Sequence, residues 1–436
     1  MVEMSFRDRA SLLLAGLEEG REVRAYLRRF SQSEDGCFAV VKIGGAVVER
    51  DLEPLANALA LLQFLGLPPV VVYGAGPQLD TDLAKAGFEE KRIDGLRVTP
   101  ETAMPLVTSA VGTMTMRLVA AMHERGALAM AMPMGTLRAK LINRDVYGAV
   151  GNPMTIDSKA ILELLASGVI PMLGCVHPDD AGQLLNVNAD GIARAVAAEL
   201  RPQKIVFVTG TGGLLGPDDQ IIDTINLAAD GETLFASDWL HGGMAHKLRE
   251  IGDLLAVLPP SSSVSVTSAE GVVRELFTHT GSGTLIRQGE AIRRKDDAHR
   301  SVFEPLINQA FKKDLKSSYW DRLTVHYGLL SDHQRAGAIV TQIDGIDVLD
   351  KFAVLGAARG EGLAKSLWQA LTEHSPQLLW RSRATNPFNG FYAAQADGFL
   401  RRGEWLVYWT GSAIEPRVQA LADELASRPG DFEGEE

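Results

Sequence analysis

The 436-residue chain has only two cysteines, Cys37 and Cys175, which lie far apart and form no Cys-x-x-Cys pair. So few thiols exclude a disulfide-stapled scaffold and indicate reduced cysteines in a cytoplasmic protein. The nine histidines show no metal-ligand spacing either, since His241 and His246 are five residues apart, off the i,i+4 spacing of one helical face. We therefore expect no metal ion held by a dedicated set of protein ligands.

Long hydrophobic runs and positive charge are also scarce. No apolar run approaches the roughly 20 residues that cross a bilayer, and the N-terminal stretch is too charged for a secretory signal. Lys and Arg number 43 against 55 Asp and Glu, which gives a net charge of −12. Because an acidic surface repels phosphate backbones and anionic membranes, we expect neither a nucleic acid nor a membrane as a partner.

Two common phosphate-binding signatures are missing. Gly210-Thr-Gly-Gly-Leu-Leu-Gly lacks the lysine of a P-loop, and no Gly-x-Gly-x-x-Gly fingerprint occurs. These absences exclude an ordinary P-loop nucleotidase and the usual dinucleotide-binding fold.

The patterning that is present divides the chain into four parts. Residues 1–34 carry apolar residues at helical spacing, which predicts an amphipathic helix that packs on its own core or docks on a second subunit. In residues 35–288, short apolar runs end in glycine and precede helical periodicity, which predicts an α/β domain with a mainly parallel sheet between helices. A charged linker over 289–302 leads into a compact α+β domain over 303–436, whose end from Arg428 onward is expected to fray.

Glycine turns follow two predicted strands of the α/β domain, at Gly44-Gly45 and at Gly74-Ala75-Gly76. Each turn places backbone N–H groups beside a helix N-terminus, where a phosphate can be held. Tight turning alone explains either turn taken singly, so their meaning depends on the motifs around them.

Five motifs occur together in a fixed order, and their combination is specific. They are Lys42-Ile-Gly-Gly, Gly74-Ala-Gly-Pro-Gln, Asp94-Gly-Leu-Arg97-Val-Thr, Asn186-Val-Asn-Ala-Asp190 and Gly243-Met-Ala-His-Lys247. In order and spacing, residues 37–287 resemble the amino acid kinase family and, within it, the N-acetylglutamate kinases.

The resemblance implies a role for each motif residue. Lys42 and Lys247 would contact the transferring phosphoryl group from opposite sides, and Asp190 would hold their ammonium groups. An acceptor carboxylate is already ionised at pH 7, so the transfer needs positioning and cancellation of negative charge rather than a base. The N-acetylglutamate site would comprise Gly74, Ala75, Arg97 and Asn186, and the phosphates of ATP, which brings Mg²⁺, would lie on Gly44, Gly45, Gly74 and Gly76.

The sequence departs from the family pattern at three places. Tyr73 and Ala75 stand where the family has His and Gly in His-Gly-Gly-Gly-Pro-Gln. Residues 111–116 lack the usual Asn-Lys, and Thr209-Gly210-Thr211 replaces Thr-Asp-Val. These departures leave open a kinase-like domain that only regulates.

The segment Glu275–Ile286 resembles the arginine-binding segment of arginine-sensitive family members, which also carry an N-terminal helix. Glu275 would pair with the guanidinium group of free arginine, and a backbone carbonyl near Gly281 would accept from it. A helix end and a glycine turn before the last strand explain the same residues equally well.

The second domain carries Arg359-Gly-Glu-Gly362-Leu-Ala364 between an apolar strand and a helix. This turn matches the R-x-x-G-x-A motif of GCN5-related acetyltransferases. Together with Trp380-Arg-Ser-Arg-Ala-Thr-Asn386-Pro, it resembles the acetyltransferase domain of vertebrate-type N-acetylglutamate synthases and of bacterial fused synthase/kinases. By that resemblance, acetyl-CoA would bind at Arg359, Gly360, Gly362 and Ala364.

Four more residues match that domain's substrate site. Lys351, Arg381, Asn386 and Tyr392 would bind glutamate or its acetylated product, and cationic side chains suit a dicarboxylate. Tyr392 would also donate a proton to the departing thiolate, although the nearby aromatic residues are equally consistent with a core position.

Both domains together predict an arginine-biosynthesis enzyme that acetylates glutamate with acetyl-CoA and phosphorylates N-acetylglutamate with ATP, inhibited by arginine. The resemblance also implies a homo-oligomer, in particular a tetramer. The alternatives are a synthase alone with a non-catalytic, arginine-sensing kinase-like domain, or an amino-acid sensor without chemistry.

Overall fold

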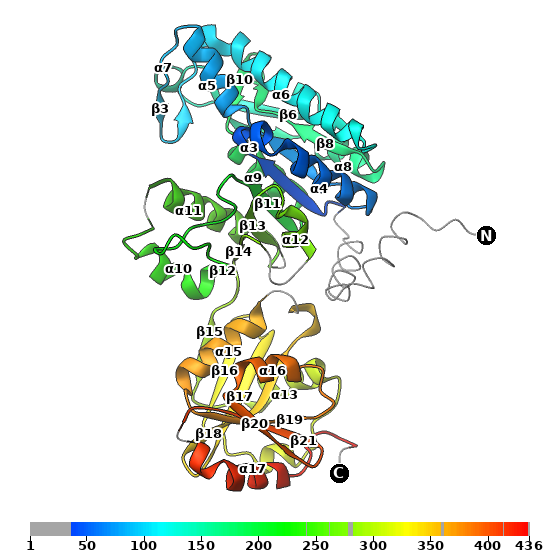
Figure 1. Ribbon diagram of the computed structural model, residues 1–436, viewed down its shortest axis with the longest axis vertical. Helices are drawn as coiled ribbons and strands as arrows, with labels where there is room; N and C mark the ends of the chain where they lie inside the picture. The colour runs from blue at the N-terminus through cyan, green and yellow to red at the C-terminus, as the bar shows by residue number, and fades with distance from the viewer. Residues whose placement is uncertain are drawn as a thin grey trace, which may run out of the picture. The chain divides into compact units, whose positions relative to one another are not determined.

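The computed structural model describes residues 36–240, 242–260, 262–277, 282–358, 362–412 and 414–434 (Figure 1). The chain divides after Gln288 into two compact units, which are described separately. The helix expected within residues 1–34 lies outside the described residues.

An eight-stranded sheet forms the centre of the first unit, and all its pairings are parallel except the one between β13 and β14. Runs such as AVVKI, VVVY and KIVFV are almost completely buried, as expected of strands covered on both faces. In sheet order the strands are β12 (Thr224–Asn226), β14 (Thr284–Arg287), β13 (Ser263–Thr267), β11 (Lys204–Val208), β1 (Ala39–Ile43), β2 (Val70–Tyr73), β8 (Ile170–Leu173) and β5 (Ala129–Ala131). The predicted α/β class is confirmed.

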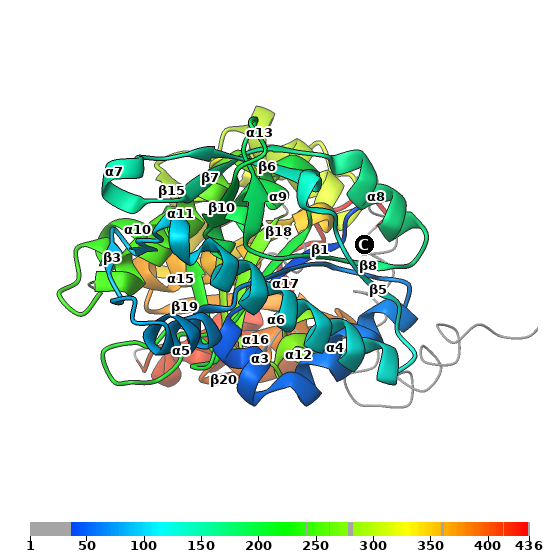
Figure 2. The same cartoon turned by 90° about the horizontal axis from the view of Figure 1, so that it is seen from above.

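Helices connect these strands. They are α3 (Gly45–Arg50), α4 (Leu52–Phe64), α5 (Gly76–Lys85), α6 (Met104–Glu124), α7 (Arg144–Tyr147), α8 (Ser158–Ala166), α9 (Ala189–Leu200), α10 (Leu227–Phe235), α11 (Gly242–Val257) and α12 (Val272–Phe277). Among the described residues, Glu101–Glu124 is the one helical stretch that length and composition alone would allow to cross a membrane. In the structure α6 runs beside α4 (Figures 1 and 2) and buries Val107, Met114 and Leu118 in the core of the unit.

A smaller four-stranded sheet and a short hairpin adjoin the main sheet. The sheet contains β6 (Leu137–Leu141), β7 (Val150–Ile156), β10 (Leu184–Val187) and β9 (Val176–Pro178), and the hairpin contains β3 (Arg92–Ile93) and β4 (Leu96–Arg97). Asp94 and Gly95 form the hairpin turn with φ values of 51° and 78°. Asp-Gly suits two consecutive left-handed positions, so this dipeptide fixes where Arg97 lies.

The second unit is built on a seven-stranded sheet in which all pairings are antiparallel except that of β18 with β19. In order the strands are β15 (Ile292–Lys295), β16 (Tyr327–Ser331), β17 (Ala336–Ile343), β18 (Ile346–Val354), β19 (Leu378–Arg383), β21 (Trp405–Thr410) and β20 (Gly398–Arg402). The parallel pairing ends at Leu349 and Trp380, although both strands continue. The two strands therefore separate at Asp350 and Arg381.

Helices cover both faces of this sheet. Those of the unit are α13 (Arg300–Phe311), α14 (Tyr319–Arg322), α15 (Leu363–His374), α16 (Asn389–Gln395) and α17 (Val418–Ser427). Buried residues of α15 and α16 share one apolar cluster, whereas those of α13 and α17 belong to two other clusters. The predicted α+β class is confirmed.

Two local predictions for this unit are wrong. The sequence predicts a linker over 289–302, but Ile292–Lys295 forms the edge strand β15, which pairs with β16. An edge strand pairs with a neighbour on one side, so it can carry charged side chains. Those charged side chains made the segment resemble a linker. The end of the chain is not frayed either, because Phe432 is buried and bridges to Leu315.

Candidate active sites

The first site lies where β1 and the N-terminus of α9 meet. Lys42 leaves the end of β1, and its Nζ lies 2.8 Å from Oδ1 of Asp190 in the first turn of α9. Asn188 caps that helix by accepting from the backbone N–H of Asp190, which fixes the carboxylate at the helix start. The sequence motif Asn-x-Asp is thus a cap and a functional carboxylate together.

Charge holds this carboxylate ionised. Burial alone would raise the pKa of Asp190, but the ion pair with Lys42 and the charges of Lys247 and Arg194 lower it below its usual range. Burial lowers the pKa of Lys247, and the negative charge of Asp190 offsets part of this lowering. Lys247, from α11, places its Nζ 5.4 Å from the centroid of the Phe207 ring. Asp190 therefore pairs directly with Lys42 and interacts electrostatically with Lys247.

A cavity of about 240 Å³ opens beside Lys42. Eight of the residues singled out from the sequence line it: Lys42, Gly44, Gly45, Gly74, Ala75, Gly76, Arg97 and Asn186. The two glycine turns touch, because a Cβ on Gly45 would lie 2.9 Å from both the Gly74 carbonyl oxygen and the Gly76 nitrogen. Glycine at position 45 thus allows the two turns to share one side of the cavity.

The departures from the family pattern fit this site. Ala75 has φ −120°, a value open to any residue, so its methyl group introduces no backbone strain. The Tyr73 hydroxyl hydrogen-bonds the Thr115 hydroxyl of α6, so two of the departures contact one another. Burial raises the pKa of Tyr73 to about 12, which keeps the phenol neutral.

Arg97 closes the other end of the cavity. Its guanidinium pairs with Asp80 of α5, and its Nη1 is buried without a hydrogen-bond partner among the described residues. Asn186 donates to the Thr99 hydroxyl at 3.0 Å. Arg92 also lines the cavity and was missed from the sequence. Its pairing with Arg97 across the Asp-Gly hairpin is the signal that would have found it.

The predicted arginine-binding residues are only partly described. Glu275 is buried in α12, and its Oε2 accepts from the backbone N–H groups of Ser282 and Gly283 at 3.0 and 3.2 Å. That carboxylate therefore closes the turn into β14. Gly281 lies outside the described residues, so the arginine contact stays a prediction.

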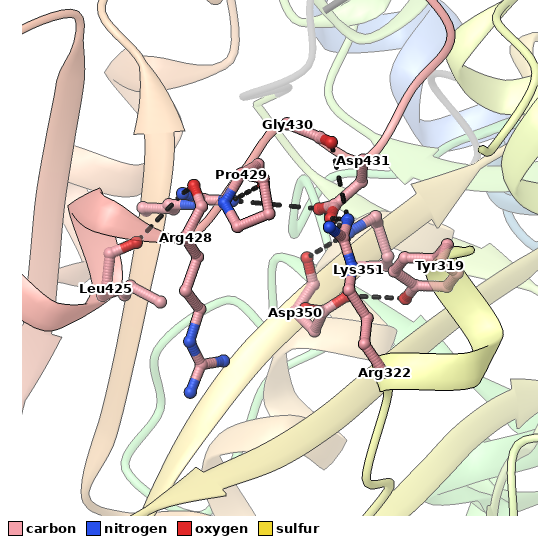
Figure 3. A network of polar contacts seen from close by, with 10 residues as sticks. Tyr319, Arg322, Asp350, Lys351, Leu425, Arg428, Pro429, Gly430 and Asp431 are labelled. Carbon is pink, nitrogen blue, oxygen red and sulfur yellow. Dashed lines mark hydrogen bonds and ion pairs between the residues drawn. The ribbon is translucent and has the colours of Figure 1, made fainter. Parts of the chain in front are cut away.

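In the second unit, the structure separates the four predicted glutamate-binding residues into two groups. Lys351 contacts Asp431 (Figure 3), and Arg381 lies 3.9 Å from the same carboxylate. Both lie on the face covered by α13 and α17. Tyr392 packs against Trp380, and successive strand residues point to opposite faces, so Tyr392 lies across the sheet from Arg381.

Of the remaining predicted residues that the structure describes, Asn386 follows β19, and Gly362 and Ala364 lie at the start of α15. Asn386 donates to the Ser382 hydroxyl at 2.8 Å and accepts from the Phe388 backbone N–H, which shapes the turn before α16. Gly362 precedes α15 with φ +78°, and Ala364 is half-buried in the first turn of that helix. Arg359 and Gly360 lie outside the described residues, so their contact with acetyl-CoA stays a prediction.

A glycine-lined cavity with Lys42 on its wall, and with Asp190 paired to that lysine, lies at the strand ends of a mainly parallel sheet. This arrangement defines an α/β protein with a site for a phosphate-bearing ligand. The chain belongs to the amino acid kinase family, whose model matches residues 38–256. Residues 292–428 match the model of the N-acetyltransferase of N-acetylglutamate synthase.

Relatives extend over both units. The acetylglutamate kinase of Xanthomonas campestris is 40% identical over 94% of this chain and 99% of its own length. The mitochondrial N-acetylglutamate synthase of Danio rerio is 28% identical over 98% of this chain and 81% of its own length. The structure of Neisseria gonorrhoeae N-acetylglutamate synthase with coenzyme A and N-acetylglutamate matches at 20% identity, with a TM-score of 0.67 over 90% of this chain and 99% of that one. The structure of the same synthase with coenzyme A and L-arginine matches with a TM-score of 0.60, over 89% of this chain and 97% of that one.

Proposed function

We propose that the protein catalyses two steps of arginine biosynthesis: acetylation of the α-amine of L-glutamate by acetyl-CoA, and phosphorylation of N-acetyl-L-glutamate by ATP. The observation that carries the second activity is Lys42, which lines the glycine-lined cavity and pairs with Asp190, the carboxylate on which the charge of Lys247 also acts. The match of both units to their families supports the pairing of the two steps.

In the kinase step, a carboxylate oxygen of the acceptor attacks the γ-phosphorus of ATP, and the bond to the β,γ-bridging oxygen breaks. Lys42 and Lys247 offset the negative charge on the transferring group, while Asp190 keeps both ammonium groups in place. Arg97 holds the acceptor through its buried Nη1, which has no hydrogen-bond partner among the described residues.

Mg²⁺ is proposed to enter with ATP. Among the described residues no three His, Cys, Asp or Glu side chains gather, whereas phosphate oxygens are good ligands for this ion. Bound there, Mg²⁺ neutralises part of the phosphate charge.

In the acetyltransferase step, the neutral amine of glutamate forms a bond to the acetyl carbonyl carbon and the C–S bond breaks. The nitrogen releases a proton to water, and the departing thiolate takes a proton. Tyr392 is our candidate donor, since it packs on Trp380, where β18 and β19 separate. Burial raises the pKa of Tyr392, so the hydroxyl keeps its proton until the thiolate forms.

Changing Tyr392 to phenylalanine is therefore expected to lower kcat for acetyl transfer by roughly 10²-fold, the usual contribution of one general acid. The KM for glutamate and the kinase activity should not change. Steady-state kinetics of both reactions check this, and an unaltered kcat for acetyl transfer would remove Tyr392 from the chemistry.

Two assays test the proposed function itself. N-acetylglutamate with MgATP and hydroxylamine should give a hydroxamate from the trapped acyl phosphate, and glutamate with acetyl-CoA should release free thiol. Thiol release without hydroxamate would favour the alternative, a synthase with a regulatory kinase-like domain.

We further propose that free arginine inhibits the enzyme through Glu275, and that the chain forms a homotetramer in the cytoplasm. Activity that is unchanged at saturating arginine would contradict inhibition by arginine. Light scattering that reports a single chain would contradict the tetramer. Fractionation that places the protein outside the cytoplasm would contradict the proposed location.

A further inference from the structure

The chain after α17 crosses the sheet of the second unit at the point where β18 and β19 separate. Phe432 bridges to Leu315, and the Asp431 carbonyl accepts from the Lys316 N–H at 2.9 Å. These contacts hold the segment Arg428–Phe432 over Lys351 of β18. The segment belongs to none of the strands of the seven-stranded sheet, so its displacement breaks no pairing of that sheet.

One carboxylate in this segment faces three cations (Figure 3). Asp431 lies 2.6 Å from Lys351 Nζ, pairs with Arg322 of α14, and lies 3.9 Å from Arg381 Nη2. Lys351 also contacts the Asp350 carboxylate at 2.7 Å. Asp431 and Asp350 thus share the cationic cluster at the strand separation, and Asp431 comes from the segment after α17.

The Arg381 guanidinium is engaged by the same part of the chain. It donates to the backbone carbonyls of Leu425, Arg428 and Pro429 at 2.9, 2.6 and 2.9 Å. Arg381 therefore caps the end of α17 and positions the segment that carries Asp431.

A cavity of about 330 Å³ adjoins this cluster. Polar side chains line much of it: Arg322, Thr324, Thr341, Gln342, Asp350, Arg381, Arg428 and Asp431. Thr341 is 4% exposed, and its hydroxyl has no hydrogen-bond partner among the described residues. An unpaired buried hydroxyl is costly, and a polar ligand in the cavity would satisfy it.

We propose that Asp431 is a stand-in for a carboxylate of the amino-acid substrate, and that Arg322 is a substrate-anchoring residue. An incoming dicarboxylic amino acid replaces Asp431 as the ion-pair partner of Lys351 and Arg322. The segment Arg428–Phe432 then moves aside. Replacing one carboxylate by another keeps the buried cations paired throughout, so no uncompensated charge is left behind. This inference rests on the acetyltransferase activity proposed above and adds a residue and a movement to it.

Two substitutions in the full-length protein should then act in opposite directions on the KM for glutamate. Arg322→Gln removes an anchor and should raise it roughly tenfold, the effect of one lost charged hydrogen bond. Asp431→Asn weakens the competitor and should lower it about fivefold, with kcat no lower than in the wild type. Glu433→Gln, an exposed charge change two residues along, is the matched control and should leave the KM unchanged.

A fixed structural ion-pair cluster would give a different pattern, with both substitutions raising the KM or lowering kcat, and that result would overturn the inference. Hydrogen exchange on the wild type covers the case in which Asp431→Asn fails to fold. Backbone amides of residues 430–434 should lose protection when saturating glutamate and coenzyme A are added, and unchanged protection would also overturn it. A wild type without acetyl transfer would instead count against the proposed function.

Discussion

Lys42→Ala is expected to lower kcat for phosphorylation of N-acetylglutamate by about 10²–10³-fold, with a much smaller change in the KM for the acceptor. The reason is the position of Lys42 at the rim of the glycine-lined cavity, with its Nζ 2.8 Å from Asp190. Without that ammonium group, negative charge on the transferring phosphoryl group faces the ionised carboxylate of Asp190. Initial rates over a matrix of ATP and acceptor concentrations measure the effect.

Lys159→Ala serves as the control, since this lysine is 85% exposed and makes only a surface pair with Glu163. It should leave both activities unchanged. A Lys42→Ala enzyme that retains its kcat while the KM for ATP rises would show that Lys42 only binds nucleotide.

Gly45→Ala is expected to impair folding and ATP binding together. The added Cβ would approach backbone atoms of Gly74 and Gly76 to 2.9 Å, and backbone cannot yield as a flexible side chain does. Overpacking of this kind costs about 1–3 kcal/mol of stability, which should appear as a lower Tm. The displaced turns should also raise the KM for ATP by at least roughly tenfold.

Gly112→Ala is the matched control, because a Cβ there meets nothing within 4 Å and the position is in the exposed face of α6. It should keep or raise the Tm, since alanine favours a helix more than glycine does. A Gly45→Ala protein with unchanged Tm and unchanged KM for ATP would contradict the close approach of the two turns.

The kinase-like site was predictable because its parts are tied to strand and helix ends. Lys42 ends a buried strand and Asp190 starts a capped helix, and in a parallel sheet such ends gather at one edge. The Asp94-Gly95 turn likewise fixed Arg97. Arg92 was missed because its place in the cavity depends on cross-strand pairing within the hairpin rather than on a motif.

The second site was less predictable, because its groups come together through tertiary contacts. Arg428 onward resembles a disordered tail by composition, yet Asp431 is held by cations from β18 and α14. Successive side chains of β19 point to opposite faces of the sheet. Trp380 and Arg381 therefore lie on different sides of the sheet, although they are adjacent in the sequence motif. Neither fact follows from local sequence.

If one chain carries both reactions, a single reaction vessel should convert glutamate all the way to the trapped acyl phosphate. The purified protein receives glutamate, acetyl-labelled acetyl-CoA, MgATP and hydroxylamine, and mass spectrometry follows the label. We predict labelled N-acetylglutamyl hydroxamate from the wild type, and accumulation of labelled N-acetylglutamate without hydroxamate from Lys247→Ala. If the wild type also stops at labelled N-acetylglutamate, the chain does not phosphorylate its acetylated product.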